Sequence, residues 1–448
     1  MVGPILHGSV LPTQRKSSLL QDVPLSLIAG IISSYGIVLA LQSLRISLMV
    51  GSLLALLGLG CFGISLLKQP NNAVETRSSS IIKWLGVSVV CLLYLAPLLT
   101  QPLTDWDARS IWFFHAKMIY SAGSFSQSTG WQHPSVEFSH PDYPNLVPVL
   151  AAQAAYVKGF WNEYLPKVSL FFLLVPAVIW LFTFARLSIS AAVLLLLLPF
   201  SLREYLWNGY MDGYLALYFS VALLLLGRYS VNRQTIDLVS SLSCLSLLLY
   251  IKNEGVVAAL AGLIARGGVA LLKPGHQLGS LRRILADHRQ IGLLGIGQVL
   301  PFILWSFYKQ QWGLSNDLQI GTGQSLALIT SRLTSGALTL ILQRAGEQIA
   351  SAVLLVGFLS AILIAQKIAR PPGVVWVWLA IGLYFIGLTV VYLLTPFELA
   401  WHLETSLSRT MLSISSGLYG VSFFLLDSLE RHHQQTSLQN RQPVIAET

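Results

Sequence analysis

A few short motifs in this sequence carry ionisable side chains suited to acid–base and phosphate chemistry. Asp105 and Asp107 lie on either side of a tryptophan, and either carboxylate could accept a proton from a hydroxyl group. Lys167, Lys252 and Arg409 could bind the negative charge of a phosphate group. This combination fits glycosyl transfer to a hydroxyl, in which a carboxylate base acts while the acceptor attacks the anomeric carbon.

Further acids and histidines lie in neighbouring motifs and could complete such a site: His115, His140, Asp142, Asp212, Glu254, His402 and Glu404. Each also has a purely structural interpretation. Asp212 could cap a helix, Asp142 could belong to a proline-rich turn, and His402 could be a packed histidine. Asp105 and Asp107 could instead hold a divalent metal such as Mg²⁺ or Mn²⁺, although two carboxylates are a small ligand set. The hypothesis therefore depends on several of these groups meeting at one surface.

The elements that must position these groups are apolar helices. The chain has 448 residues, of which 54% are hydrophobic and only 10% charged, and its mean hydropathy is +0.65. A soluble protein carries about 25% charged residues. Runs of apolar residues recur along the chain at about the 20-residue length that crosses a bilayer as a helix. The sequence therefore predicts an all-α polytopic membrane protein.

Twelve segments are predicted to span the bilayer: 24–43, 46–67, 81–100, 163–185, 188–202, 212–228, 236–252, 254–272, 290–308, 347–367, 373–394 and 409–427. If the amino terminus is cytoplasmic, seventeen of the 28 Lys and Arg residues fall on the cytoplasmic side, as the positive-inside rule requires. The carboxyl terminus is then cytoplasmic as well. Asp105 and Asp107 face the exterior or the periplasm.

The chain is expected to have four parts. Residues 1–80 form a cytoplasmic segment, a transmembrane hairpin and a linker, and residues 81–272 form the candidate catalytic core with an external loop at 102–162. Residues 273–427 contain further spans with external loops at 309–346 and 395–408, and residues 428–448 form a disordered cytoplasmic tail. Within the first external loop, the patterns of Ala108–Ala122 and Leu146–Tyr156 predict two helices that lie at the membrane interface.

The net charge of +9 does not require a nucleic-acid partner. The surplus Lys and Arg residues lie in the predicted cytoplasmic loops, where they face anionic lipids. The expected partners are therefore membrane lipids and the substrates of the external site.

The external motifs resemble those of GT-C membrane glycosyltransferases, in particular the protein O-mannosyltransferase and aminoarabinose-transferase type. The first large loop contains an acidic motif, Asp105-Trp-Asp107, and a proline-rich motif, His140-Pro-Asp-Tyr-Pro144. A basic residue, Lys167, precedes the next span, and an acid, Asp212, opens a later span. A junction between two spans contains a lysine, in Ile251-Lys-Asn-Glu-Gly255. The resemblance covers residues 81–272 best. Family members often carry an Asp-Glu pair where this chain has Asp-Trp-Asp.

The resemblance implies a GT-C fold and an inverting transferase in a bacterial inner or plasma membrane. Such an enzyme would move a sugar from a polyprenyl-phosphate-linked donor to an extracytoplasmic glycan, lipid or protein acceptor. It implies a first-loop aspartate as the general base, with Asp107 favoured because it directly precedes the first interfacial helix, and Asp105 second. Lys167, Lys252 and Arg409 would bind the donor phosphate. The alternatives are a transporter or flippase of a lipid-linked or small solute, and a ligase or polymerase of surface polysaccharide.

Overall fold

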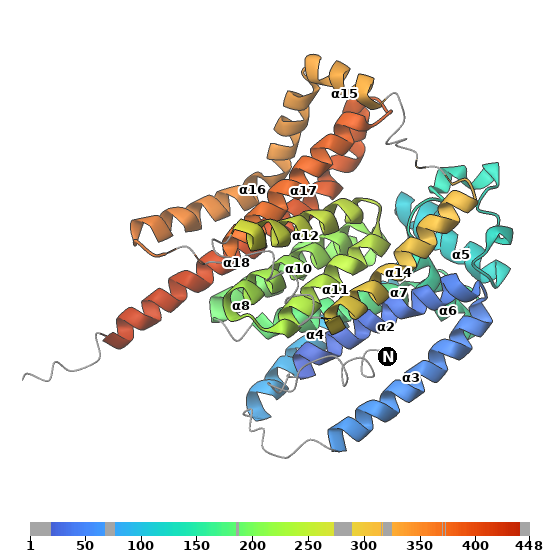
Figure 1. Ribbon diagram of the computed structural model, residues 1–448, viewed down its shortest axis with the longest axis horizontal. Coiled ribbons are helices and arrows are strands. Elements are labelled where there is room, and N and C mark those ends of the chain that lie inside the picture. Colours follow the sequence, from blue (N-terminus) through green and yellow to red (C-terminus); the bar gives the residue numbers. More distant parts are fainter. Residues whose placement is uncertain are drawn as a thin grey trace, which may run out of the picture.

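The computed structural model describes residues 19–67, 77–184, 188–272, 289–314, 316, 325–369, 371 and 373–439. Within these ranges the chain forms helices and no strand (Figure 1). Most of the predicted linker at 68–80, part of the loop at 309–346 and the last residues of the predicted tail lie outside the described ranges.

Each of the twelve segments predicted to span the membrane coincides with a helix: α2 (Leu19–Leu41), α3 (Leu44–Leu67), α4 (Arg77–Thr100), α7 (Val168–Phe184), α8 (Ile189–Ser201), α10 (Asp212–Asn232), α11 (Thr235–Ile251), α12 (Glu254–Leu272), α14 (Arg289–Gln311), α16 (Ala337–Ala365), α17 (Val374–Leu394) and α18 (Leu399–Gln439). Seven described helical segments are long and apolar enough to cross a membrane: α2, α4, α7 together with the turn that precedes it (Leu165–Phe184), α10, α16, α17 and α18. The chain is thus a multi-pass helical membrane protein. The 13 residues of α8 span about 20 Å, less than the bilayer core of about 30 Å, so twelve crossings remain a prediction.

Two helices extend well beyond the predicted spans. Helix α16 begins at Ala337 and not at 347, and α18 begins at Leu399 and not at 409. Together with α15 (Ser325–Thr334), they fill much of the predicted loops at 309–346 and 395–408 with helix. Helix α18 also continues to Gln439, so the prediction of a disordered tail from 428 is wrong for its first twelve residues. Hydropathy marks where apolar residues end, whereas residues 399–408 and 428–439 contain no Pro or Gly and continue α18 into polar sequence.

Helix α10 forms the centre of the bundle. Every residue from Asp212 to Gly227 is buried, and α7, α11, α17 and α18 pack around the helix. The hydroxyl groups of Tyr214 and Tyr218 donate hydrogen bonds to backbone carbonyls of α7, at 2.9 Å to Leu170 and 2.6 Å to Leu173. These bonds satisfy polar atoms that burial would otherwise leave unpaired. The first residue of α10 is therefore fixed at one end of the bundle.

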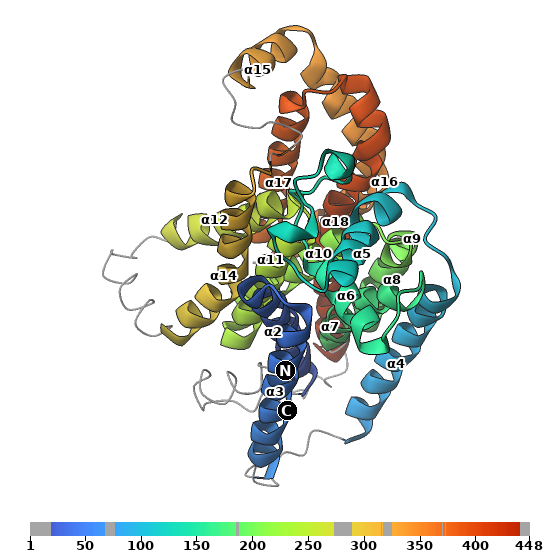
Figure 2. The same ribbon diagram turned by 90° about the vertical axis from the view of Figure 1, so that its right-hand side faces the viewer.

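The first external loop is built of short helices: η1 (Ala108–Trp112), α5 (Phe113–Ala122), η2 (Gln127–Thr129), η3 (Pro134–Ser139), α6 (Leu146–Lys158) and η4 (Leu165–Lys167). The helices predicted at 108–122 and 146–156 are therefore confirmed, the first with a π-helical turn at its start. Helices α5 and α6 pack against each other and lie over one end of the bundle (Figures 1 and 2). The short α9 (Arg203–Trp207) lies before α10.

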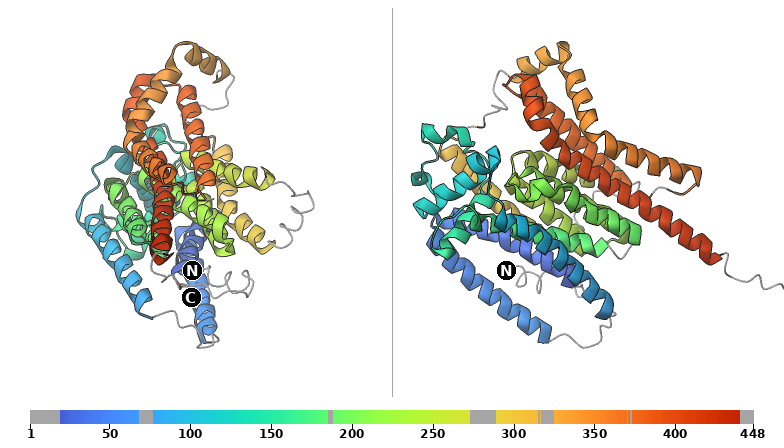
Figure 3. Two further views of the ribbon diagram at one scale, coloured as in Figure 1. Left: turned by 90° about the vertical axis from the view of Figure 1, so that its left-hand side faces the viewer. Right: turned by 180° about the vertical axis from the view of Figure 1, so that it is seen from behind.

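The helix connections gather at two opposite ends of the bundle. The first-loop helices lie at one end, and the carboxyl end of α18 points away from it (Figure 3). Side chains at the start of α10, at the α11–α12 connection and ten residues into α18 meet at the first-loop end. The alternating helix directions therefore bring together motifs that are as much as 302 residues apart in the sequence.

Candidate functional site

A chain of five charged side chains from four separate elements lies at the first-loop end of the bundle. Arg409 of α18 donates a hydrogen bond to Asp107 at 2.5 Å, and its Nη1 is 3.8 Å from Asp212 at the start of α10. Lys252, between α11 and α12, donates to Asp212 at 2.9 Å and lies 3.2 Å from Glu254. We call Asp107, Asp212, Lys252, Glu254 and Arg409 the charge network.

The charge network is largely removed from solvent. Asp212 is 4% exposed and Lys252 is 6% exposed. Charges in such surroundings must be paired, because desolvation of a lone ion costs several kcal/mol. Oδ2 of Asp212 and Oε2 of Glu254 are buried without a hydrogen-bond partner among the described residues. The first of these atoms lies 3.8 Å from Nη1 of Arg409, so its charge is balanced without a hydrogen bond.

Two glycines let the backbone approach closely around the network. Gly255 opens α12 immediately after the network residues, and a Cβ there would lie 1.9 Å from the Leu248 carbonyl oxygen. Gly209 has φ +93°, and a Cβ there would lie 2.6 Å from the Cβ of Ala108. A side chain at 255 would disturb the α11–α12 turn, and one at 209 would push the first loop away from α10. Asp212 follows this turn as the first residue of α10, whose cap position is Met211, so the predicted capping role does not apply.

Asp105 lies beside the network without belonging to it. Burial raises the pKa of its carboxyl group, the negative charges of Glu204 and Asp107 raise it further, and Arg409 opposes them. Between the two aspartates, Trp106 is 70% exposed. The π-helical turn η1 starts directly after Asp107, and such turns are frequent at functional sites. The motif thus presents two carboxylates and an apolar ring at one surface.

Two residues near the site were not predicted as functional. The guanidinium group of Arg409 lies over the ring of Tyr210, 4.7 Å from its centroid. Glu204 of α9 acts on the carboxyl group of Asp105 through its charge. The position of Tyr210 two residues before Asp212 is a signal in the sequence that could have pointed to it. Nothing in the local sequence pattern marks Glu204.

His140 and Asp142 lie close to the network. The carboxylate of Asp142 accepts hydrogen bonds from Asn253 at 2.9 Å and Asn316 at 3.1 Å, which ties the first loop to the residue next to Lys252. The ring of His140 stacks on Tyr143 with 5.0 Å between centroids. Asp142 therefore holds the proline-rich motif beside the network, whereas the stacking contact of His140 with Tyr143 lies within the motif itself.

Lys167 makes its contacts elsewhere. Its side chain is fully buried, and its ammonium group donates a hydrogen bond to the backbone carbonyl of Gln101, one residue beyond α4. It also lies over the ring of Tyr164 at 5.6 Å. A lysine at the carboxyl end of a helix satisfies carbonyl groups and the helix dipole. The geometry therefore favours a structural role for Lys167 over the predicted contact with a donor phosphate.

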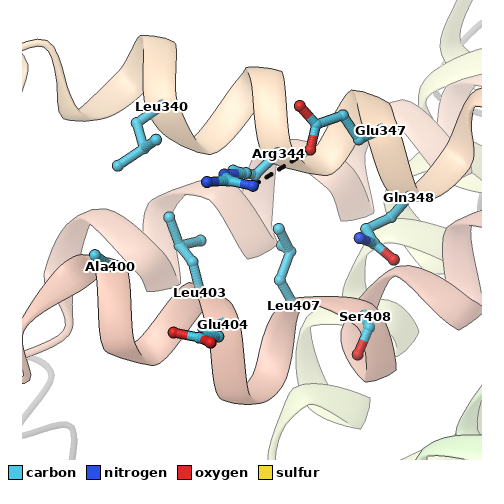
Figure 4. Close-up of a pocket in the computed structure, with 9 residues that line it drawn as sticks. All are labelled: Leu340, Arg344, Glu347, Gln348, Ala400, Leu403, Glu404, Leu407 and Ser408. Atoms are coloured by element: carbon cyan, nitrogen blue, oxygen red, sulfur yellow. Dashed lines mark ion pairs between the residues drawn. The ribbon is translucent and has the colours of Figure 1, made fainter.

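His402 and Glu404 precede Arg409 on α18 and have other neighbours among the described residues. The ring of His402 packs against Tyr392 and Phe397, with centroids 5.1 and 5.8 Å away. Glu404 lines a groove of about 380 Å³ between α16 and α18, opposite Arg344, which forms an exposed pair with Glu347 (Figure 4).

His115 has a structural role in the first loop. Its Nδ1 lies 3.0 Å from the side-chain oxygen of Asn145, its Nε2 lies 3.0 Å from the hydroxyl group of Ser139, and Trp131 packs against the ring. Burial lowers the pKa of His115 to about 3. The imidazole is therefore neutral at physiological pH and connects α5 to the segments that precede α6.

A metal site is not formed by the described side chains. No group of three or more His, Cys, Asp or Glu residues in the described ranges is arranged to hold a metal ion. Asp107 already pairs with the cation of Arg409, which would repel a second cation at the same oxygen atoms. Asp105 and Asp107 therefore do not fit the predicted Mg²⁺ or Mn²⁺ site.

Comparisons with known proteins give no identification. No protein-family model matches the chain, and neither a curated protein nor a solved structure matches it. The argument for a function therefore depends on the geometry of the charge network and on the motifs that form it.

Proposed function

We propose that this protein is a membrane glycosyltransferase of the GT-C type. It moves a sugar from a polyprenyl-phosphate-linked donor to an extracytoplasmic acceptor in a bacterial inner or plasma membrane, with both chain termini on the cytoplasmic side. The observation that carries the proposal is the charge network, because it joins carboxylates and cations from the first loop, α10, the α11–α12 junction and α18. A structural role alone would not need so many buried charges at the end of an apolar bundle.

In the proposed reaction, Asp107 takes the proton from an acceptor hydroxyl group. The acceptor oxygen forms a bond to the anomeric carbon as the bond from that carbon to the phosphate oxygen breaks. The electron pair of the broken bond leaves with the phosphate, and the sugar is inverted. Arg409 and Lys252 stabilise the charge that develops on the leaving phosphate.

The pairing of Asp107 with Arg409 couples the base to the phosphate-binding group. A donor phosphate would compete with Asp107 for the guanidinium group, and the released carboxylate would be free to accept a hydrogen bond from the acceptor hydroxyl group. Asp105, whose pKa is raised, is the second candidate for the base. The exposed Trp106 supplies apolar surface beside these charges, as an amphipathic lipid-linked donor requires.

The proposal is tested with membranes from cells that contain or lack the protein. Radiolabelled polyprenyl-phosphate sugars are supplied, and the label is followed into lipid, glycan and protein fractions. Label that depends on the protein supports a transferase and identifies its acceptor class. Addition of one sugar separates a transferase from a polymerase, which would make long chains. If the abundant, folded protein transfers no label but moves substrate across proteoliposome membranes, the protein is a transporter and the proposal is wrong.

A further inference from the structure

A cavity of about 620 Å³ lies at the end of the bundle opposite the charge network. It forms where the carboxyl end of α10, the connection from α16 to α17, and the later part of α18 meet. Its walls combine basic, apolar and polar side chains: Arg228, Val231, Asn232, Lys367, Ile368, Ala369, Pro371, Phe424, Asp427, Ser428, Arg431, His432 and Gln435. Its volume lies within the range of about 300–1,000 Å³ that is usual for small-molecule sites.

Three Lys and Arg side chains line this cavity, and two of them are paired with an acid. Arg228 pairs with the buried Asp237 at 2.7 Å, and Arg431 pairs with Asp427 at 2.9 Å. Lys367 is exposed and has no ion-pair partner within the described ranges. An anion entering the cavity would therefore meet one uncompensated ammonium group and two further cations.

The position of Lys367 is set by the end of α16. It follows the last residues of that helix with φ +55°, a left-handed conformation that turns the chain towards α17. Its amide donates a hydrogen bond to the carbonyl of Ile364, and the next amide bonds to Leu363. This turn fixes the backbone of Lys367 at the cavity wall.

We propose that this cavity binds the phosphate group of an anionic membrane lipid. Lys367, Arg431 and Arg228 supply the positive charge, while Val231 and Phe424 supply apolar surface for the start of the acyl chains. Basic pockets between transmembrane helices on the cytoplasmic side are suited to such headgroups. The proposal does not depend on glycosyl transfer, because the cavity shares no residue with the charge network.

The experiment measures thermal unfolding of the purified full-length protein in a neutral detergent. Phosphatidylglycerol is titrated as the anionic probe, phosphatidylcholine as the zwitterionic control, and glycerol phosphate as the soluble phosphate. We expect phosphatidylglycerol to raise the unfolding midpoint more than phosphatidylcholine does. Lys367→Gln should weaken phosphatidylglycerol binding about five-fold, since one basic residue contributes about 1 kcal/mol to anionic-lipid binding. Lys367→Arg should retain most of the affinity.

The control variant is Lys158→Gln, which removes an exposed lysine from the first-loop end and should leave the affinity unchanged. The unfolding midpoint of each variant without lipid shows whether it is folded. Glycerol phosphate binding that is equally sensitive to Lys367→Gln would keep the phosphate site but assign it to a soluble ligand. Equal effects of the two phospholipids, or unchanged binding by Lys367→Gln, would overturn the proposal.

Discussion

Replacing Lys252 by Met tests whether the charge network is a mutually dependent unit. Lys252→Met keeps the length of the side chain but leaves Asp212 buried without its 2.9 Å partner. Removing one member of a buried ion pair costs about 3–5 kcal/mol. Arg409 remains 3.8 Å from Asp212 and compensates part of the charge, so we expect a loss of about 3 kcal/mol in unfolding free energy.

The assay is a double-mutant cycle, measured by reversible denaturation in mixed detergent micelles. Asp212→Asn combined with Lys252→Met removes both charges of the pair and should recover part of the loss, because Glu254 still lacks its partner at 3.2 Å. The matched control is Arg344→Met, which breaks an exposed pair with Glu347 and should cost less than about 1 kcal/mol. If Lys252→Met costs no more than Arg344→Met, or if the two network substitutions are additive, the network is not a coupled buried unit.

Three further predictions follow from the site and the first loop. The pKa of His115 is lowered to about 3 from the ordinary 6.5, so between these pH values the unfolded chain binds a proton that the folded chain does not. The unfolding free energy should therefore fall as pH decreases from 6.5 towards 3, by up to about 1.4 kcal/mol per pH unit. His115→Gln should remove this contribution, as measured by denaturation curves at several pH values. Arg409→Gln should lower kcat/KM for the lipid-linked donor about 10- to 100-fold, as expected for loss of a charged hydrogen bond. Arg409→Lys keeps the positive charge and should lower kcat/KM less, so equal losses would contradict stabilisation of the phosphate by that charge. EDTA should leave the transfer rate unchanged, because Arg409 occupies the carboxylate of Asp107; a loss restored by Mg²⁺ or Mn²⁺ would show a metal requirement.

The positions of the helices could be predicted from the sequence because apolar runs of bilayer length are a strong local signal. Helix ends were less predictable. Leu399 begins α18 ten residues before the predicted span, because residues 399–408 combine polar groups with good helix formers. The carboxyl end of α18 likewise continues past the predicted span into polar sequence. There Arg431 and Asp427 form an ion pair one helical turn apart, which stabilises the helix.

The members of the site were partly predictable. Topology alone places Asp107, Asp212, Lys252 and Arg409 at the same end of the bundle, and the structure brings all four into one network. Which side chains pair with one another at the first-loop end depends on which helices are neighbours in the bundle. The local sequence around each residue does not show this. Lys167 illustrates this, because its sequence position resembles a phosphate-binding site while its side chain satisfies the carbonyl of Gln101.

The most direct test of the central claim is single-sugar transfer by the purified protein with Asp107→Asn as the decisive variant. The donor is a radiolabelled polyprenyl-phosphate sugar, the acceptor is the fraction labelled in membranes, and folding of each variant is confirmed by its unfolding midpoint. The account predicts protein-dependent transfer by the wild-type chain and a loss of about 10²–10⁴-fold in Asp107→Asn, the range for removal of a general base. Undiminished transfer by folded Asp107→Asn would contradict the assignment of the base. The absence of transfer from any donor would contradict the glycosyltransferase itself.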